Sequence, residues 1–436
     1  MLIAFRCKNY KTYQDETVFS MVEDHYLDDT EELEASVVTQ QCADIKIRTL
    51  IASVIYGPNA SGKTNIIEAM DLLKTIVLNG DIRTVETPTS CKHSITYPCI
   101  ILNKDTRDKS LELSIEFIHE SILFQYDLVL DLGVTTSQNR KRIILERLYI
   151  NNQKVFSRKL NTLQVIINKS LEEFFIDSKQ NIRNLKQIAE TELVDTELFL
   201  TNGFKHLFSE QLVQTIYKWF ETSFMICLDP HQVFIYPTSL PRRKIQLIEN
   251  AINTALQNFG INQNKVVYTA DESPLSMTKI SIVDGQKIPA ALYESLGTLR
   301  FMHVFPLLAT ALSLGGTVIF DELDASIHPA AIINIVQNFH DLTINVNDAQ
   351  LIFNTHNPIF LNDRLFRRDE IKFVDRDEYT GKSELYQLSD FRTHVDNPAK
   401  DLHSYMRNYF LHRYGGIRDV DFSHAFRQLI ENDKER

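Results

Sequence analysis

The stretch that most constrains this chain is Gly57–Thr64, which fits the pattern G-x-x-x-x-G-K-[ST]. An apolar run, Leu50–Ile55, precedes it and predicts a buried strand, and Ile66–Leu73 follows it and predicts a helix. Gly57 and Gly62 allow the backbone to turn its N–H groups toward an anion at the start of that helix. The pattern therefore predicts a phosphate-binding loop. The alternative, a chance glycine-bearing turn, is disfavoured because only 13 of the 436 residues are glycine, against an average of about 7%.

Two side chains in this loop are suited to bind a nucleoside triphosphate and its metal ion. Lys63 is placed to reach the β- and γ-phosphates, and the hydroxyl of Thr64 is placed to hold Mg²⁺. The predicted ligands are therefore ATP and Mg²⁺. The residues predicted to contact ATP are Gly57, Pro58, Asn59, Ala60, Ser61, Gly62, Lys63, Thr64 and Asn65.

A second short apolar strand, within Gly315–Glu322, ends in two acids. Phosphoryl transfer needs a carboxylate near Mg²⁺ and a group that orients the attacking water. Asp321 is predicted to hold Mg²⁺ together with Thr64, and Glu322 is predicted to polarise the water. Many strands end in acids, so the pair alone leaves a structural role open. The next segment, Leu323–Pro329, favours the catalytic interpretation.

Two further segments carry polar residues beside apolar elements. A strand over Gln350–Thr355 ends at His356, which is placed to contact a γ-phosphate, although a lone histidine is more often structural. Upstream, Ser295–Thr298 opens an apolar helix over Phe301–Leu314. This segment fits either an anion site at a helix N-terminus or a plain N-cap, because serine and threonine are favoured there.

Composition limits the class of protein. With 44% hydrophobic and 24% charged residues, the chain is typical of a globular protein, and no apolar run approaches the 18 residues of a transmembrane helix. The five cysteines have no metal-binding spacing, which favours free thiols and a cytoplasmic location. The net charge of −11 argues against a uniformly basic nucleic-acid surface. Local basic clusters leave contact with DNA, RNA or an acidic partner open: Arg140–Arg142, Arg242–Lys244 and Arg364–Arg368.

Hydrophobic periodicity predicts an α/β architecture in three parts. Residues 1–158 form the N-terminal part of a nucleotide-binding head, with an antiparallel β-meander over 99–158. Residues 159–228 form a helical insertion, and residues 229–436 form the C-terminal part of the head. Surface loops and short strands are also predicted, including a loop over Thr84–Pro98 and a strand over Phe234–Tyr236.

These motifs together resemble the ABC-type ATPase heads of the RecF/SMC/OLD group, in particular the AbiLi/RloA-type "AAA family" ATPases of bacterial phage-defence (abortive-infection) operons. Glu294–Thr298 resembles the signature of that group, Phe320–Pro329 resembles its Walker B motif and D-loop, and Asn354–Pro358 resembles its H-loop. Its N-terminal strand and C-terminal segments have counterparts in Phe5–Lys11, Phe366–Val374 and Tyr414–Ile417. The signature lacks the second glycine of Leu-Ser-Gly-Gly, and no Q-loop can be placed.

The resemblance implies a P-loop ABC-ATPase head with a mixed central sheet, an antiparallel β subdomain and a helical insertion. It also implies a homodimer or higher homo-oligomer that shares its ATP sites between subunits. One subunit then supplies Gly57–Thr64, Asp321, the catalytic residues Lys63, Glu322 and His356, and the D-loop residues Asp324 and Ser326. The other subunit supplies the signature residues Ser295, Gly297 and Thr298.

The leading functional hypothesis is an ATPase that acts as a sensor or switch in anti-phage defence and controls a separately encoded effector, such as a nuclease or toxin. It rests on the resemblance and on the residues after His356, where Asp375 and Asp377 have the spacing of a TOPRIM nuclease motif without a nuclease domain. The alternatives are a RecF/SMC-like DNA-repair ATPase that binds DNA directly and, less favoured, the ATPase subunit of a transporter. A nucleic acid or a phage protein is a possible further partner, and no membrane association is expected.

Overall fold

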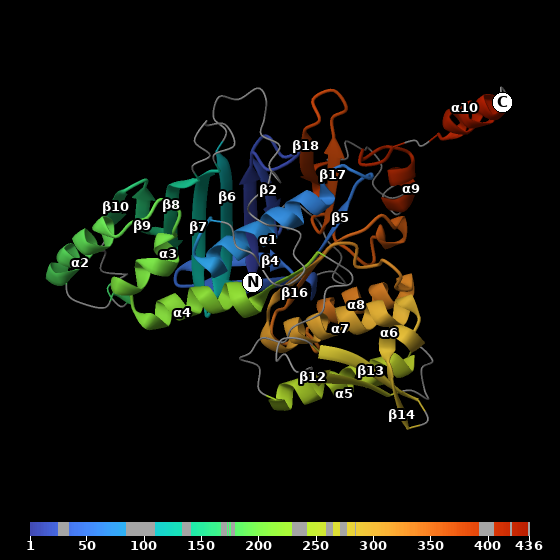
Figure 1. The fold of residues 1–436 in the computed structure, drawn as a ribbon, viewed down its shortest axis with the longest axis horizontal. Helices are drawn as coiled ribbons and strands as arrows, with labels where there is room; N and C mark the ends of the chain where they lie inside the picture. Colours follow the sequence, from blue (N-terminus) through green and yellow to red (C-terminus); the bar gives the residue numbers. More distant parts are fainter. Residues whose placement is uncertain are drawn as a thin grey trace.

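Two β-sheets and the helices packed on them form the body of the protein (Figure 1). The computed structural model describes residues 1–24, 35–83, 110–132, 141–166, 172, 174–175, 179–228, 242–258, 265–270, 277–283, 285–391, 405–418 and 421–434. The predicted loop over Thr84–Pro98 and the predicted strand over Phe234–Tyr236 lie outside these residues.

The central sheet has six strands in the order β11-β15-β16-β5-β17-β18, and all neighbours are parallel except β17 and β18. The strands are β5 (Ala52–Tyr56), β11 (Phe224–Cys227), β15 (Thr317–Phe320), β16 (Gln350–Asn354), β17 (Ile371–Arg376) and β18 (Ser383–Gln387). Strands β5, β15 and β16 are buried along their whole length. Because parallel strands end at one edge of a sheet, the segments after these three strands meet there.

The second sheet is antiparallel and has seven strands in the order β10-β9-β8-β7-β6-β1-β2. Its strands are β1 (Leu2–Lys8), β2 (Thr17–Ser20), β6 (Leu111–His119), β7 (Ile122–Asp131), β8 (Arg142–Ile150), β9 (Gln153–Lys159) and β10 (Thr162–Val165). The meander predicted from alternating apolar residues is confirmed by β6, β7, β8 and β9. Its buried face shares one hydrophobic core with α1 (Lys63–Asn79), the helix after the glycine loop.

The stretch 159–228 is helical in its middle, with α2 (Lys179–Thr191), α3 (Phe199–Asn202) and α4 (Glu210–Lys218). It differs from the expectation at both ends, where β10 extends the antiparallel sheet and β11 forms the edge of the central sheet. A π-helical turn, Trp219–Ser223, joins α4 to β11. The four apolar residues of β11 directly follow a helix, and a run this short cannot be told from more helix by its period.

Trp219 is completely buried and packs between the two sheets rather than facing a ligand. Its ring stacks on Phe117 of β6 at a centroid distance of 3.9 Å and on Phe224 of β11 at 4.8 Å. This confirms that the single tryptophan is a packing residue. It joins the end of the helical stretch to both sheets.

Of the remaining elements, α7 (Leu296–Leu314) and α8 (Pro329–His340) pack on strands of the central sheet. Helix α7 packs on β15 and on α5 (Arg242–Asn258), beside a small sheet of β12 (Lys265–Ala270), β13 (Met277–Val283) and β14 (Gln286–Pro289). The others are β3 (Val37–Cys42), β4 (Ile45–Leu50), α6 (Ala290–Tyr293), α9 (Tyr405–Phe410) and α10 (Ser423–Lys434). In Figure 1, α10 stands clear of the body.

Two expectations drawn from composition can be compared with the fold. Cys7, Cys42 and Cys227 are buried free thiols, while Cys91 and Cys99 lie outside the described residues. Among the described helices, α7 is long and apolar enough to cross a membrane by length and composition. Such a sequence is also typical of a core helix, and α7 lies against β15 and α5.

Candidate functional site

The glycine loop lies between the end of β5 and the start of α1, at the centre of the parallel sheet. Both of its glycines are required by close approach. A Cβ on Gly57 would collide with the carbonyl oxygen of Val374, and a Cβ on Gly62 would lie 2.7 Å from Ser383 Oγ. Gly62 also has a φ of +115°, which side chains disfavour. The backbone therefore forms a tight cradle at the N-terminus of α1, where an anion is favoured.

Residues from distant parts of the chain support this cradle. The hydroxyl of Tyr13 donates to the carbonyl of Gly62 at 3.0 Å, and Asn65 Nδ2 donates to Thr12 Oγ1 at 2.8 Å. On the other side, the Ser383 hydroxyl donates to the carbonyl of Ser61. The loop is thus fixed by the turn after β1 and by β18.

Lys63 is buried, with 5% of its surface exposed, and its ammonium group donates to the carbonyls of Gly57 at 2.8 Å and Pro58 at 3.0 Å. Burial lowers the pKa of Lys63 to about 8, and the negative charges of Asp321 and Glu322 partly oppose this shift. The ammonium group is therefore held inside the loop, next to both acids, and is charged at neutral pH.

The lowered pKa of Lys63 predicts a pH dependence of ATP binding. The phosphates favour the protonated ammonium group, so affinity is highest below the free-protein pKa of about 8 and falls as pH rises through it. At pH 9 we expect ATP to bind about tenfold more weakly than at pH 7, measured by calorimetry. Lys63→Arg keeps its charge across this range, and an equal loss of affinity in that variant would assign the effect to another group.

Asp321 faces the first turn of α1. The hydroxyl of Thr64 donates to its two carboxylate oxygens at 2.9 and 3.2 Å, and Asn354 Nδ2 donates to Oδ1. Burial raises the pKa of Asp321, while the hydrogen bonds from Asn354 and Thr64 lower it. A hydroxyl and a carboxylate in direct contact are hard oxygen ligands of the kind that Mg²⁺ prefers. The residues present therefore fit a magnesium ion.

Glu322 is exposed next to Asp321, in a left-handed backbone conformation with φ of +51°. Its N–H donates to Asn354 Oδ1 at 2.6 Å, and its carbonyl accepts from Arg300 Nη2 at 3.1 Å. A non-glycine residue in this conformation costs about 1–3 kcal/mol and persists only where its surroundings hold it. The bonds from Asn354 and Arg300 to its main chain supply that support.

His356 follows β16 and lies within electrostatic reach of the glycine loop. Desolvation by the surrounding protein and the charge of Lys63 lower the pKa of His356, and Glu322 and Asp324 oppose the shift. The pKa of Asp324 is raised, chiefly by burial, although Thr355 donates a hydrogen bond to its carboxyl. The structure therefore brings the predicted Lys63, Asp321, Glu322, Asp324 and His356 together in one chain.

The predicted signature residues lie at the start of α7. Ser295 is the N-cap of this helix, and its hydroxyl accepts from the N–H of Thr298 at 3.2 Å. Gly297 lies against the D-loop, because a Cβ there would be 2.7 Å from the carbonyl oxygen of Ser326. Apart from main-chain bonds of the helix, the contacts of Ser295, Gly297 and Thr298 are with one another and with Ser326, and they join the signature and the D-loop within one chain.

The sequence matches a family described as "AAA domain, putative AbiEii toxin, Type IV TA system" over residues 52–362, which is well over half of the chain. The chain belongs to this AAA family. This membership, with the glycine loop and the mixed sheet, makes the fold that of an α/β P-loop ATPase head. No curated protein matches the sequence.

Several solved structures are similar to this member of the AAA family. A structure described as the SmcHead bound to the C-winged helix domain of ScpA is 12% identical, with a TM-score of 0.39 and coverage of 88% of this chain and 97% of that one. The SMC head domain from Thermotoga maritima is 13% identical, with a TM-score of 0.38 and coverage of 88% and 98%. An SMC head with an extended coiled coil, bound to the C-terminal domain of ScpA from Pyrococcus furiosus, is 10% identical, with a TM-score of 0.39 and coverage of 88% and 96%.

The site of this AAA protein includes residues to which the sequence patterns assign no role of their own, although Asn354 falls within the segment that resembles an H-loop. Asn354 and Arg300 hold the main chain of Glu322, and Tyr13, Thr12 and Ser383 support the glycine loop. Asn354 lies at the carboxyl end of a predicted strand, two residues before His356, and that position was an available signal. The remaining four lie in other parts of the chain, and only the fold brings them to the site.

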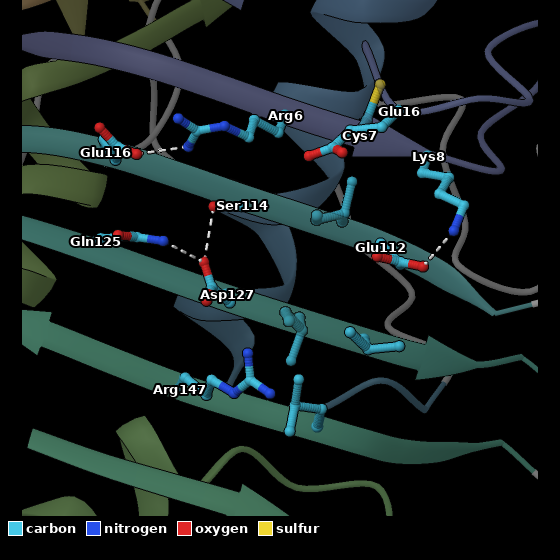
Figure 2. A pocket seen from close by; sticks show the side chains of 14 residues that line it. Arg6, Cys7, Lys8, Glu16, Glu112, Ser114, Glu116, Gln125, Asp127 and Arg147 are labelled. Atoms are coloured by element: carbon cyan, nitrogen blue, oxygen red, sulfur yellow. Dashed lines mark hydrogen bonds and ion pairs between the residues drawn. The ribbon is translucent and has the colours of Figure 1, made fainter. Parts of the chain in front are cut away.

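A separate hollow of about 440 Å³ lies on the outer face of the antiparallel sheet (Figure 2). Two ion pairs join neighbouring strands in this hollow: Arg6 with Glu116 at 2.5 Å and Lys8 with Glu112 at 2.9 Å. Asp127 accepts hydrogen bonds from Ser114 and Gln125. Cross-strand pairs of this kind stabilise an exposed sheet face. None of the predicted nucleotide-binding residues lines this hollow.

Proposed function

We propose that this protein binds and hydrolyses ATP, and that the nucleotide state controls its assembly and a separately encoded partner. The observation that carries the proposal is the direct contact between Thr64 and Asp321, which joins the glycine loop to the acids at the end of β15. A structural strand end would not require an acid to face the first turn of α1. The hydroxyl of Thr64 and the carboxylates of Asp321 and Glu322 together supply the parts of a phosphoryl-transfer site.

Each residue has a distinct role in this proposal. The loop N–H groups and Lys63 bind the phosphates, and Thr64 and Asp321 hold Mg²⁺. When bound, Mg²⁺ neutralises charge that develops on the phosphate oxygens. Glu322 accepts a proton from the attacking water, and His356 contacts the γ-phosphate. Burial lowers the pKa of His356, which favours a neutral imidazole that can both donate and accept a hydrogen bond.

The exposure of the signature segment supports assembly through shared ATP sites. Ser295 is exposed at the start of α7, and its apolar neighbours Leu292 and Leu296 are 81% and 70% exposed. Exposed apolar residues around a polar anion-binding segment are typical of an interaction surface. We therefore propose that Ser295, Gly297 and Thr298 complete the ATP site of a second subunit, so that ATP stabilises the assembled state.

The biological setting belongs to the same proposal. The family description refers to a putative toxin of a Type IV toxin–antitoxin system, and the motifs resemble ATPases of phage-defence operons. We propose a cytoplasmic switch for anti-phage defence, whose ATP-bound and hydrolysed states differ in how they hold an effector such as a nuclease or toxin. Such a switch requires only that the protein makes different contacts with the effector in its ATP-bound and hydrolysed states.

The test is to purify the chain with the products of its neighbouring genes and to measure the mass of the complex with and without Mg-ATP. We expect a larger assembly in ATP, with a neighbouring protein bound in one nucleotide state. A chain that stays monomeric and partnerless in both conditions would contradict the switch. Salt-dependent binding of duplex DNA by the isolated chain in ATP would instead favour a DNA-repair ATPase.

A further inference from the structure

The main chain of Glu322 is held at both of its polar groups by side chains from other elements. Its N–H donates to Asn354 Oδ1 at 2.6 Å, and its carbonyl accepts from Arg300 Nη2 at 3.1 Å. Asn354 is completely buried at the end of β16, and Arg300 is 5% exposed in the first turns of α7. Because Glu322 has a φ of +51°, its direction depends on this support.

The carboxamide of Asn354 also contacts the preceding acid. Nδ2 donates to Asp321 Oδ1, while Oδ1 of the same amide accepts from Glu322 N–H. An amide offers a donor and an acceptor on one rigid plane. A carboxylate offers acceptors only, and a hydroxyl is one atom that is too short to span both groups. Asparagine is therefore chemically matched to the carboxylate of Asp321 and the main-chain N–H of Glu322.

We propose that Asn354 is a positioning residue for ATP hydrolysis, which fixes Glu322 relative to Asp321 while Arg300 holds the other end of the Glu322 peptide. This inference rests on the hydrolysis proposed above. The side chain of Asn354 contacts the Asp321 carboxylate and the Glu322 main chain, so its effect on the reaction passes through these two acids. It sets the distance between the carboxylate that holds the metal and the carboxylate that polarises the water, and misplacement by about 1 Å can cost about a hundredfold in rate.

A purely structural role makes a different prediction, and the chain offers a matched control. Asn345 is also buried, and its carboxamide also bonds through both nitrogen and oxygen, donating to the carbonyls of Phe339 and Ala349 and accepting from Ala349 N–H. It lies before β16, at the end of the strand opposite to the site. Replacement of either asparagine removes a buried amide, but only Asn354 contacts the acids.

The experiment compares Asn354→Thr with Asn345→Thr in the full chain. We expect Asn354→Thr to lower the single-turnover hydrolysis rate by about 10- to 100-fold, with ATP affinity within about twofold of the wild-type value. Asn345→Thr should lower the thermal midpoint and leave the hydrolysis rate unchanged. If Asn354→Thr fails to fold, Asn354→Ser leaves space for a water and is tested in the same way.

The decisive readout is a double-mutant cycle with Glu322→Gln. If Asn354 acts through Glu322, Asn354→Thr should lower the residual rate of Glu322→Gln by less than about twofold. Two results would overturn the positioning role. One is an equal fold-loss of hydrolysis when Asn354→Thr is made in the wild-type chain and in Glu322→Gln, and the other is a wild-type hydrolysis rate in the Asn354→Thr single variant. A wild-type chain that binds ATP without hydrolysing it would instead overturn the proposed function.

Discussion

Glu322→Gln is expected to lower ATP hydrolysis by about a thousandfold while leaving ATP binding intact, because it removes one general base. Glutamine has nearly the same shape, and the bonds from Asn354 and Arg300 go to the Glu322 main chain, so the loop keeps its conformation. The variant should hold ATP in the shared sites and accumulate as the assembled form. Single-turnover hydrolysis and mass measurement in Mg-ATP check both results.

A matched exposed acid serves as the control for Glu322→Gln. Glu378 lies in the turn between β17 and β18, and 73% of its side chain is exposed. Glu378→Gln should hydrolyse ATP at the wild-type rate and disassemble normally. Retention of hydrolysis by Glu322→Gln would assign the water-polarising role to another group, such as His356.

The parts of the fold that are readable from the sequence are those with a local period or a backbone constraint. The alternating apolar residues of β6, β7 and β8 identify strands because the meander has one buried face. Gly57 and Gly62 identify the phosphate loop because no other residue fits those two positions. Both signals can be read from the local sequence alone, without knowing which other segments of the chain pack nearby.

The parts that the sequence leaves open depend on contacts between distant segments. Strand β11 is defined by pairing with β15, nearly a hundred residues later, and not by its own four residues. Tyr13 and Arg300 carry no local motif, and they reach the site only through the order of the strands. Ser295 caps α7 and is also exposed. The structure is therefore compatible with both the N-cap and the signature interpretation of this residue.

Lys63→Met is expected to abolish ATP binding without destabilising the nucleotide-free protein. Burial already lowers the pKa of Lys63 to about 8, so the charged ammonium is held at a cost that an apolar side chain of similar length removes. Wild-type protein at an ATP concentration about 100 times its Kd should gain about 2.7 kcal/mol of unfolding free energy, and the variant should gain almost none. Denaturation with and without Mg-ATP measures both quantities.

The control for this last prediction is a second buried lysine. Lys372 is 2% exposed in β17, burial also lowers its pKa to about 8, and it donates to the carbonyl of Asp369 at 2.9 Å. Lys372→Met also removes a buried ammonium group, but that group bonds to Asp369 rather than to the phosphate loop, so ATP should still stabilise that variant fully. If both variants lost ATP stabilisation equally, the effect would come from perturbing the central sheet. If only Lys63→Met loses stabilisation by ATP, the ammonium group of Lys63 binds the phosphates.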